Sequence, residues 1–298
     1  MVAKIIVMTG GTSGFGTITT KKLLQEPGTY LILGSRNKRI EGAEHLPLNL
    51  KSLKSAREFA SAVIQKIGSK KIDVLICNAG MNYPNVDTKT EDGFETTFAV
   101  NHLSHFLLIY LLQSYLIKNA KVILTTSGTH NPAEGSRAAP PKHANVYWLA
   151  YPEKDKTLDE SGKINSQRAY SSSKLCNLLT ARYIDITKEN LQGIAYDPGP
   201  TPGTGLSQHL SFPVRILWKL VSVSILRKRA FPKSNSIEDA GNALANIALG
   251  KITLPKGKNY AALRAGKMTF PLPSELAQND EVMEKVWNDS HKLLQLEN

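Results

Sequence analysis

Short apolar runs alternate with longer amphipathic segments along most of the chain. The short runs are rich in β-branched residues and predict strands at 4–8, 30–33, 45–48, 73–77, 121–125, 193–196 and 258–263. The longer segments predict helices from the end of the first strand to about residue 25 and over 52–67, 101–117, 168–188 and 274–294. Ser236, with Asp239 three residues later, predicts the start of a further helix, which Gly250 ends.

The predicted strands are apolar along nearly their whole length, as in a parallel sheet that helices cover on both faces. Right-handed crossovers between such strands produce a doubly wound α/β fold of the Rossmann type. No linker, repeat or change of composition divides the chain, so we expect a single domain over 1–298. Two stretches, 131–167 and 199–235, are too long for simple connections and are expected to be functional lids.

The composition is that of a globular, basic protein. It has 37 Lys and Arg against 25 Asp and Glu, a net charge of +12, which favours anionic partners such as nucleotide phosphates or an acidic membrane surface. No nucleic-acid recognition motif is present, so nucleic acid is not an expected partner. The two cysteines cannot form a disulfide framework and indicate a reducing, cytoplasmic compartment. We expect no targeting segment, and no membrane span at 101–117, which is too short and too polar.

A glycine-rich turn follows the first strand, with glycines at 10, 14 and 16. Small residues let backbone amides and a helix N-terminus approach a pyrophosphate closely. The turn therefore predicts a dinucleotide cofactor, and an ordinary strand-to-helix turn is the alternative. The residues expected to hold the cofactor here are Gly10, Thr12, Ser13, Gly14, Phe15 and Gly16.

The second strand ends in Ser35 and Arg36, followed by Lys38 and Arg39. A cofactor without a 2′-phosphate would need an acidic residue here to hold its ribose hydroxyls. A guanidinium can instead bind a phosphate through two hydrogen bonds. The sequence therefore favours NADP(H), with Ser35 and Arg36 as its contacts, and the alternative is a solvated basic loop.

These motifs resemble those of the short-chain dehydrogenase/reductase superfamily, in order, from about residue 3 to residue 250. Thr9 to Gly16 resembles the family's T-G-x-x-x-G-x-G, 78–80 its N-A-G, 170–174 its Y-x-x-x-K and 198–199 its P-G. Two branches look closest. The segment 100–108 is similar to retinol dehydrogenase-like members, and 129–132 and 173–177 are similar to light-dependent protochlorophyllide reductases, which also carry cysteine at the positions of Cys77 and Cys176.

The resemblance implies further cofactor contacts. Asn49 and Leu50 correspond to the family's adenine-side Asp and Leu, so hydrogen bonding is kept but the charge is lost. Gly80 replaces the Ala that is usual in protochlorophyllide reductases. The other residues implied near the cofactor are Asn78, Ala79, Gly80, Tyr170, Lys174, Pro198, Gly199, Thr201 and Thr204.

Tyr170 and Lys174 are four residues apart on a predicted helix and therefore project from one face. A phenol has a reference pKa of about 10, and a neighbouring ammonium lowers it, which fits Tyr170 for proton exchange with a carbonyl or alcohol oxygen. The alternative is a pair of surface helix residues. The resemblance adds that Lys174 holds the nicotinamide ribose. It also implies that Ser127, with Thr126 as the alternative register, binds the substrate oxygen, and that Asn101 kinks the central helix and holds a proton-relay water.

Other reactive side chains do not form a recognisable site. His102, His105 and His130 lack the spacing of metal ligands and have no carboxylate nearby, so no metal is predicted. Cys77 and Cys176 are interpreted as small core residues rather than nucleophiles.

The stretch 198–237 has no acidic residue but many bulky apolar ones, and the resemblance makes 199–235 a substrate lid. Its six basic residues are Arg215, Lys219, Arg227, Lys228, Arg229 and Lys233. One hypothesis is a lid that closes over a large lipophilic substrate or rests peripherally on an acidic membrane surface. The alternative is a helix that packs on its own core and exposes a solvated basic face.

Together these features predict an NADP(H)-dependent oxidoreductase that transfers hydride between nicotinamide and a carbonyl or alcohol of a lipophilic substrate. Two alternatives stay open: C=C reduction on a tetrapyrrole, as in protochlorophyllide reductases, and a catalytically idle NADP-binding regulator. The resemblance also implies a homo-oligomer that associates through the helices at 101–117 and 170–188.

Overall fold

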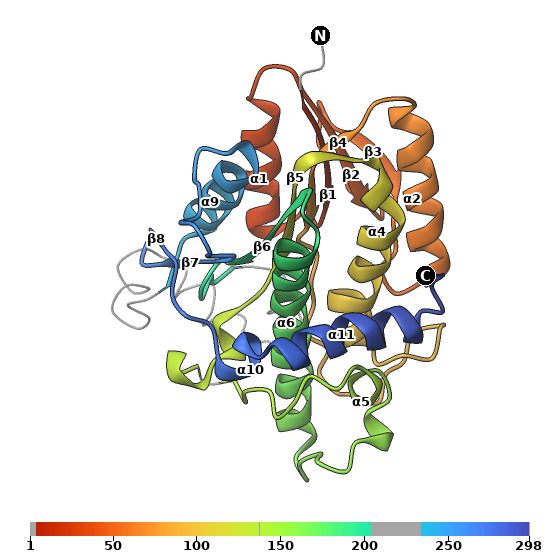
Figure 1. The fold of residues 1–298 in the computed structure, drawn as a ribbon, viewed down its shortest axis with the longest axis vertical. Helices are drawn as coiled ribbons and strands as arrows, with labels where there is room; N and C mark the ends of the chain where they lie inside the picture. Colours follow the sequence, from red (N-terminus) through yellow and green to blue (C-terminus); the bar gives the residue numbers. More distant parts are fainter. Residues whose placement is uncertain (1–3, 137, 204–233, 298) are drawn as a thin grey trace.

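A computed structural model of the protein describes residues 4–136, 138–203 and 234–297 (Figure 1). Most of the predicted basic lid, together with Thr204, lies outside these residues. None of the described helices is both long and apolar enough to cross a membrane.

Eight strands of the described residues form one sheet, in the order β3-β2-β1-β4-β5-β6-β7-β8. They are β1 (Lys4–Thr9), β2 (Thr29–Ser35), β3 (Glu44–Pro47), β4 (Ile72–Cys77), β5 (Leu116–Thr125), β6 (Leu191–Asp197), β7 (Tyr260–Arg264) and β8 (Lys267–Thr269). All neighbouring pairs are parallel except β7 with β8, so the predicted parallel sheet is confirmed and carries one further, antiparallel strand at this edge. The missed strand β8 has three residues, too few to show an alternating pattern. The strand order changes direction between β1 and β4, and ligands of doubly wound folds bind at the carboxyl ends of strands at such a point.

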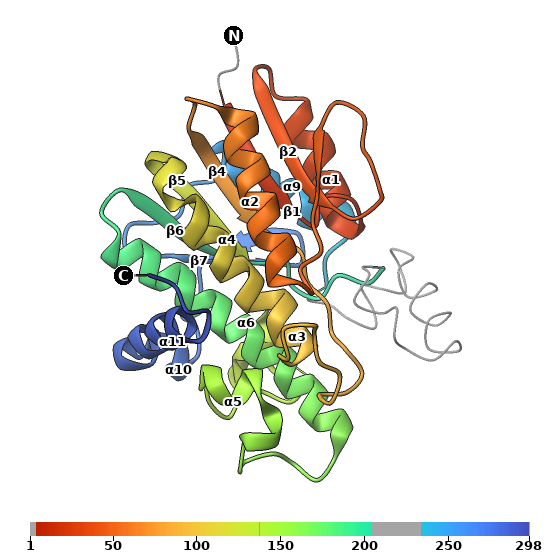
Figure 2. The same ribbon diagram turned by 90° about the vertical axis from the view of Figure 1, so that its right-hand side faces the viewer.

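Helices cover both faces of the sheet, as the sequence predicted (Figure 2). One face carries α2 (Leu53–Ile67), α4 (Ser104–Leu112) and α6 (Gly162–Thr187), and the other carries α1 (Gly14–Leu24) and α9 (Ile237–Leu249). Strand β1 supplies both cores, because Ile5 and Val7 point into the first and Ile6 and Met8 into the second. The predicted cap of α9 is confirmed: Ser236 accepts from the Asp239 amide, and the Asp239 carboxylate accepts from the Ser236 amide.

The helix predicted over 101–117 is divided and ends earlier. It consists of α3 (Thr96–Phe98), a π-helical turn (Ala99–Leu103), α4 and a short 3₁₀ turn (Gln113–Tyr115). Strand β5 already begins at Leu116, whose apolar side chain is buried beside β4. Because this region is apolar throughout, hydrophobic periodicity alone could not separate the end of the helix from the start of the strand.

The stretch 131–167, predicted as a loop, is partly helical. It contains α5 (Val146–Ala150) and 3₁₀ turns at Pro132–Glu134 and Pro152–Lys154, and α6 begins at Gly162 instead of 168. Asn165 orders the first turn of α6, since its side chain accepts from the Asp159 amide and donates to the Asp159 carbonyl.

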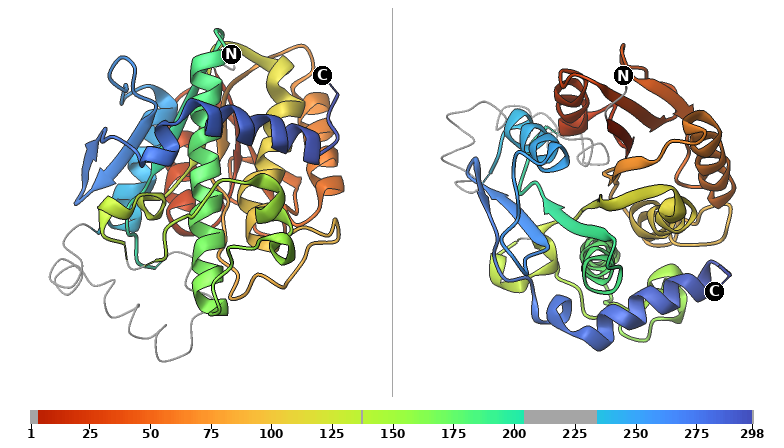
Figure 3. Two further views of the ribbon diagram at one scale, coloured as in Figure 1. Left: turned by 60° about the horizontal axis from the view of Figure 1, so that its bottom comes forward. Right: turned by 45° about the horizontal axis from the view of Figure 1, so that its top comes forward.

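The last predicted helix, 274–294, is two helices: α10 (Glu275–Gln278) and α11 (Asp280–Leu293). Asn279 separates them, because its side chain accepts from the Val282 amide and caps α11. Helix α11 crosses the outer side of α6 (Figures 1 and 3), where Trp287 stacks on Tyr183 with ring centroids 4.2 Å apart. The homo-oligomer stays a prediction, and any contact through α4 and α6 would have to include α11.

Candidate active site

The glycine turn lies at the carboxyl end of β1, next to the point where the strand order reverses. Gly10 has a φ of +68°, and a Cβ there would lie 2.7 Å from the Ala79 backbone. A Cβ at Gly16 would lie 2.0 Å from the Gly10 carbonyl oxygen. Helix α1 starts at Gly14 with no acidic residue in its first turn, and Ser13 makes no side-chain capping bond to it. The turn therefore presents a helix N-terminus to an anion, with no side chain in the way at Gly10 and Gly16.

Asn78 joins the ends of three strands beside this turn. Its side-chain amide donates to the Gly10 carbonyl at 3.0 Å, and its side-chain oxygen accepts from the Thr125 hydroxyl at 3.0 Å. Ala79 and Gly80 follow it along the floor of the site. A Cβ on Gly80 would lie 3.1 Å from Lys174 Nζ and 3.4 Å from Asn101 Oδ1, so Gly80 borders the side chains of Lys174 and Asn101.

Three exposed cations follow β2. The Ser35 hydroxyl donates to the Lys38 carbonyl at 3.1 Å and lies 3.1 Å from His45 Nδ1, which shapes the loop that carries Arg36, Lys38 and Arg39. None of the three is among the ion pairs of the described residues. They therefore leave positive charge available for an anionic ligand at the end of β2.

The predicted adenine-side pair lies after β3. Asn49 is exposed, and its side-chain oxygen accepts from the Lys51 amide at 3.2 Å. Leu50 is buried, and its carbonyl accepts from the Ser104 hydroxyl at 2.7 Å. Asn49 is thus on the surface, while Leu50 belongs to the core that supports it.

Tyr170 and Lys174 come together on one face of α6, as predicted. Lys174 Nζ lies 5.7 Å from the centre of the Tyr170 ring and donates to the Thr125 carbonyl at 3.0 Å. The Lys174 side chain is only 2 % exposed, so its ammonium is held at the carboxyl end of β5.

The structure distinguishes the two register alternatives at the end of β5. The Thr126 hydroxyl donates to the Lys174 carbonyl at 2.7 Å and so fixes α6 to the sheet. The Ser127 hydroxyl instead acts on Tyr170, whose pKa it lowers. His130 holds the Ser127 backbone, because its Nδ1 donates to the Ser127 carbonyl at 2.7 Å. Ser127, rather than Thr126, is therefore placed to share a ligand with Tyr170.

The protonation states differ in one respect from the sequence-based expectation. Burial raises the pKa of Tyr170, the Ser127 hydroxyl opposes this rise, and the charge of Asp197 adds to it. The net shift is therefore upward and not downward as the Tyr170–Lys174 spacing alone would suggest, because desolvation of the phenolate is the largest effect. Burial also lowers the pKa of Lys174 to about 8, against an opposing effect of Asp197. Near neutral pH, Tyr170 is thus a neutral proton donor beside a mostly charged Lys174.

Asn101 lies inside the π-helical turn and is completely buried. Its side-chain oxygen accepts from the Met81 amide at 2.8 Å, and its amide nitrogen donates to the Met81 carbonyl and to Ser173 Oγ, both at 2.9 Å. The Asn101 side chain therefore connects the segment after β4 to the helix that carries Tyr170 and Lys174. Its role with a relay water stays a prediction.

A buried ionic group next to Pro198 and Gly199 was missed by the sequence reading. Asp197 is 1 % exposed and accepts from Arg264 Nη2 at 2.7 Å, from the Tyr260 hydroxyl at 3.0 Å and from the Gly199 amide at 2.8 Å. Arg264 also pairs with Glu134 at 3.1 Å. Arg264 and Tyr260 are far from Asp197 in the sequence, so no local motif reveals this group. The one local signal is an acidic residue at the end of an apolar strand.

Thr201 lies in the turn that this group supports. Its hydroxyl lies 3.2 Å from the Pro198 carbonyl and 3.1 Å from the Gly199 carbonyl. The turn after β6 is therefore folded back on itself where the resemblance expects cofactor contacts.

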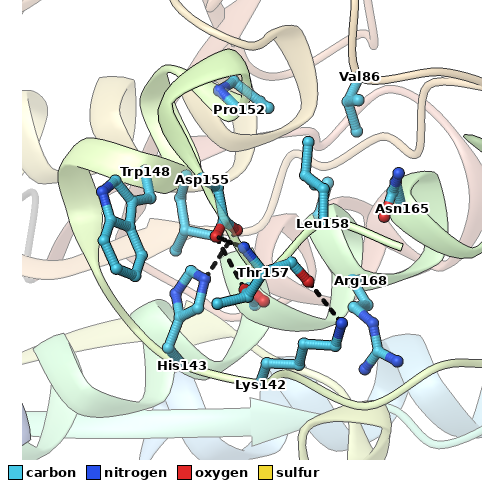
Figure 4. A pocket seen from close by; sticks show the side chains of 13 residues that line it. Val86, Lys142, His143, Trp148, Pro152, Asp155, Thr157, Leu158, Asn165 and Arg168 are labelled. Carbon is cyan, nitrogen blue, oxygen red and sulfur yellow. Dashed lines mark hydrogen bonds and ion pairs between the residues drawn. The ribbon is translucent and has the colours of Figure 1, made fainter. Parts of the chain in front are cut away.

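A small cavity lies between the α5 region and α6 (Figure 4). Its volume is about 30 Å³, room for roughly one water molecule. Its polar side chains are paired within the protein. His143 lies 2.9 Å from Asp155 (Figure 4), and Lys142 and Arg168 both pair with Asp159. Arg168 and Ser172 are each two residues from Tyr170, so they occupy the opposite side of α6. The cavity is therefore separate from the catalytic face.

In the described part of the chain, no three His, Cys, Asp or Glu side chains are grouped so that they could bind an ion. The lack of a metal stays a prediction. Cys77 and Cys176 are both buried, and burial raises the pKa of each thiol. They are core residues in the neutral form, not thiolate nucleophiles.

Comparison with known proteins agrees with this geometry. The profile of the short chain dehydrogenase family matches residues 4–138. The WW domain-containing oxidoreductase of Danio rerio is 30% identical, over 98% of this chain and 68% of that protein. The chain belongs to the short-chain dehydrogenase family of oxidoreductases.

The chain is also similar to a second kind of relative and to solved structures. The protochlorophyllide reductase of Cucumis sativus is 29% identical, over 98% of this chain and 78% of that protein. A solved structure of an uncharacterised protein from Mycobacterium paratuberculosis superimposes with a TM-score of 0.67 at 24% identity, over 99% of this chain and 95% of that one. The NADPH-bound carbonyl reductase from chicken fatty liver has a TM-score of 0.56 at 14% identity, over 91% of this short-chain dehydrogenase and 100% of that chain. These two structures support the Rossmann-type fold alone.

Proposed function

We propose that this short-chain dehydrogenase uses NADP(H) to interconvert a carbonyl and an alcohol on a lipophilic substrate. The observation that carries the proposal is the placement of Tyr170, with its ring centre 5.7 Å from the Lys174 ammonium, which is itself bonded to the last residue of β5. Ser127, two residues after β5, also lowers the pKa of Tyr170. Acid–base chemistry at a carbonyl oxygen needs a proton donor, a second hydrogen-bond donor and a charge that stabilises the conjugate base. These three side chains supply all three.

The residues present fit a dinucleotide. The glycine turn, the open N-terminus of α1 and the exposed Arg36 would hold its phosphates, and Ser35, Asn49 and Asn78 with its neighbours would line its length. Nicotinamide, when bound, supplies or accepts the hydride. The three exposed cations after β2 and the lack of an acidic side chain at Ser35 and Arg36 favour a phosphorylated ribose, and hence NADP(H).

For reduction, Tyr170 gives its proton to the substrate oxygen while the carbonyl carbon gains a hydride, and the product is an alcohol. The Ser127 hydroxyl donates a hydrogen bond to the same oxygen. The buried Lys174 ammonium stabilises the phenolate that remains, because opposite charges attract strongly where water is excluded. The bonds from Thr126 and Lys174 to α6 and β5 keep this arrangement rigid.

The test is oxidation of NADPH in the presence of retinals, steroids, quinones and aliphatic aldehydes. At least one of these substrates should be reduced, and Tyr170→Phe should lower its turnover by about 10²- to 10⁴-fold, because only the transferable proton is lost. NADPH binding, followed by its fluorescence, should survive in that variant. Wild-type turnover in Tyr170→Phe would contradict the mechanism.

A second candidate is reduction of a C=C bond in a tetrapyrrole. The similarity to protochlorophyllide reductases over 98% of this chain favours it. Protochlorophyllide with NADPH should be consumed only in the light if this candidate is right. NADPH binding with no turnover on any compound would instead support the idle regulator.

A further inference from the structure

His105 is a completely buried histidine that the mechanism above does not use. It lies in the first turn of α4 and its Nε2 is 2.9 Å from the hydroxyl of Thr9, the last residue of β1. That hydroxyl already accepts from the amides of Asn78 and Ala79, each at 3.1 Å. Both of its lone pairs are occupied, so its own proton must point to His105.

The other ring nitrogen faces the π-helical turn. His105 Nδ1 lies 3.0 Å from the Asn101 backbone carbonyl. A carbonyl only accepts, so Nδ1 must carry a proton. The two contacts independently require the same tautomer, a neutral imidazole protonated on Nδ1 and unprotonated on Nε2.

The contacts of His105 continue on both sides. Toward the cofactor turn, Asn78 bonds to the Gly10 carbonyl. Toward the catalytic helix, the Asn101 side chain donates to Ser173 Oγ, and Ser173 Oγ donates to the Tyr170 carbonyl at 2.7 Å. Hydrogen bonds and the residues Asn78 and Asn101 therefore link the turn after β1 to the backbone of Tyr170.

We propose that His105 is a positioning residue, which fixes the Asn101 carbonyl and thereby the π-helical turn relative to the cofactor turn. This inference rests on the proposed oxidoreductase function. The π-helical turn interrupts the regular helical bonding around Asn101, and such turns are common at functional sites. The imidazole gives this carbonyl a donor within hydrogen-bond reach.

The position requires an uncharged group with one donor and one acceptor. Burial lowers the pKa of His105 to about 4, and the Lys174 ammonium also disfavours its charged form. A charged imidazole would lose the acceptor that Thr9 needs. Neutral histidine, asparagine and glutamine offer an uncharged donor and acceptor on two separate atoms, whereas a hydroxyl has both on one atom.

The first test needs no activity. Two-bond ¹H–¹⁵N spectra of the ¹⁵N-histidine-labelled protein at pH 7, with the His105→Asn variant to assign the signal, report the tautomer directly. We expect a proton on Nδ1 and none on Nε2. A proton on Nε2, or a doubly protonated ring, would overturn the proposal.

The second test separates the two contacts. The side-chain amide of His105→Asn can replace Nδ1 and keep the bond to the Asn101 carbonyl, whereas His105→Gln reaches the position of Nε2 and keeps the bond to Thr9. We expect His105→Gln to lower kcat on the order of 10- to 100-fold with little change in KM for NADPH, because the reacting groups are misplaced. His105→Asn should keep kcat near the wild-type value and raise KM for NADPH.

Equal kcat losses in both variants, or wild-type kcat in both, would overturn the positioning role. Thermal unfolding with and without NADPH shows whether each variant is folded and binds the cofactor. If one variant does not fold, the tautomer measurement on the wild-type protein still decides. If the wild-type protein turns over no substrate, the proposed function fails, while the tautomer and the NADPH affinities of the variants still test the link between Thr9 and Asn101.

Discussion

Arg36 follows β2 as an exposed guanidinium outside the ion pairs of the described residues, and it is the first of the three cations on which our expectation for the cofactor rests. A charge-assisted bond to a phosphate is worth about 1.5–3 kcal/mol, or roughly 10- to 100-fold in affinity. Wild-type protein should therefore bind NADPH more tightly than NADH, and Arg36→Asp should erase or reverse the preference. Fluorescence titration with both cofactors measures it. Arg57→Asp, an equal change of charge on exposed α2, is the control, and equal wild-type affinities would contradict the expectation.

The charge of a second single residue, Asp197, affects the proton donor Tyr170. It raises the pKa of Tyr170, although less than burial does. Asp197→Asn removes the charge but keeps an oxygen for the Gly199 amide, so the pKa of Tyr170 should fall. The rise of kcat/KM with pH for alcohol oxidation, which requires the phenolate, should then begin at lower pH. Glu134→Gln is the matched control, because Glu134 also pairs with Arg264. An unchanged pH profile in Asp197→Asn would show that Asp197 does not influence the proton donor.

At the scale of elements, His102 joins the π-helical turn to α6 and α11. It is completely buried, with Nδ1 3.3 Å from Asn177 Oδ1 and Nε2 2.9 Å from Ser290 Oγ. Burial lowers the pKa of His102 to about 3. Below pH 6.5 the unfolded chain binds a proton here and the folded chain does not, so this stability is present above pH 6.5 and is lost as the pH falls.

The expected loss between pH 7.5 and pH 5.5 is about 1 kcal/mol in the free energy of unfolding. His102→Gln stays uncharged in both states and should lack this part of the pH dependence. Urea unfolding of both proteins at the two pH values measures the difference. An equal change in the two proteins would contradict the assignment.

Some elements and catalytic residues could be predicted from the sequence, and others could not. Strands such as β1 and β4, and the capped helix α9, were predicted to within one or two residues because their signals are local. Tyr170 and Lys174 could be found because a spacing of four residues fixes a shared helical face. The π-helical turn at Asn101 has no distinct periodicity in an apolar stretch. The bond between Asp197 and Arg264 joins residues 67 positions apart, which only the sheet brings together.

At the scale of the whole molecule, the positive charge is uneven along the chain. Six of the basic residues lie in 198–237, which has no acidic residue, so we expect salt-sensitive binding to anionic liposomes and weaker binding to neutral ones. Replacing Arg227, Lys228 and Arg229 by Gln should reduce binding in a flotation assay. The same change at the exposed Lys54, Lys70 and Lys256 is the control. Protein that stays in the soluble fraction at low and high salt would contradict membrane contact.

The position of α11 late in the sequence also determines when its contacts can form during synthesis of the chain. His102 is synthesised 188 residues before Ser290, its hydrogen-bond partner. Phe106 and Tyr183 are likewise synthesised before Trp287, on which their rings pack. Contacts between such distant residues form slowly, and apolar surface that is exposed in the meantime favours aggregation. The nascent protein therefore exposes an apolar surface on its central helices until α11 has been synthesised, and this is the interval in which a chaperone would have most to protect.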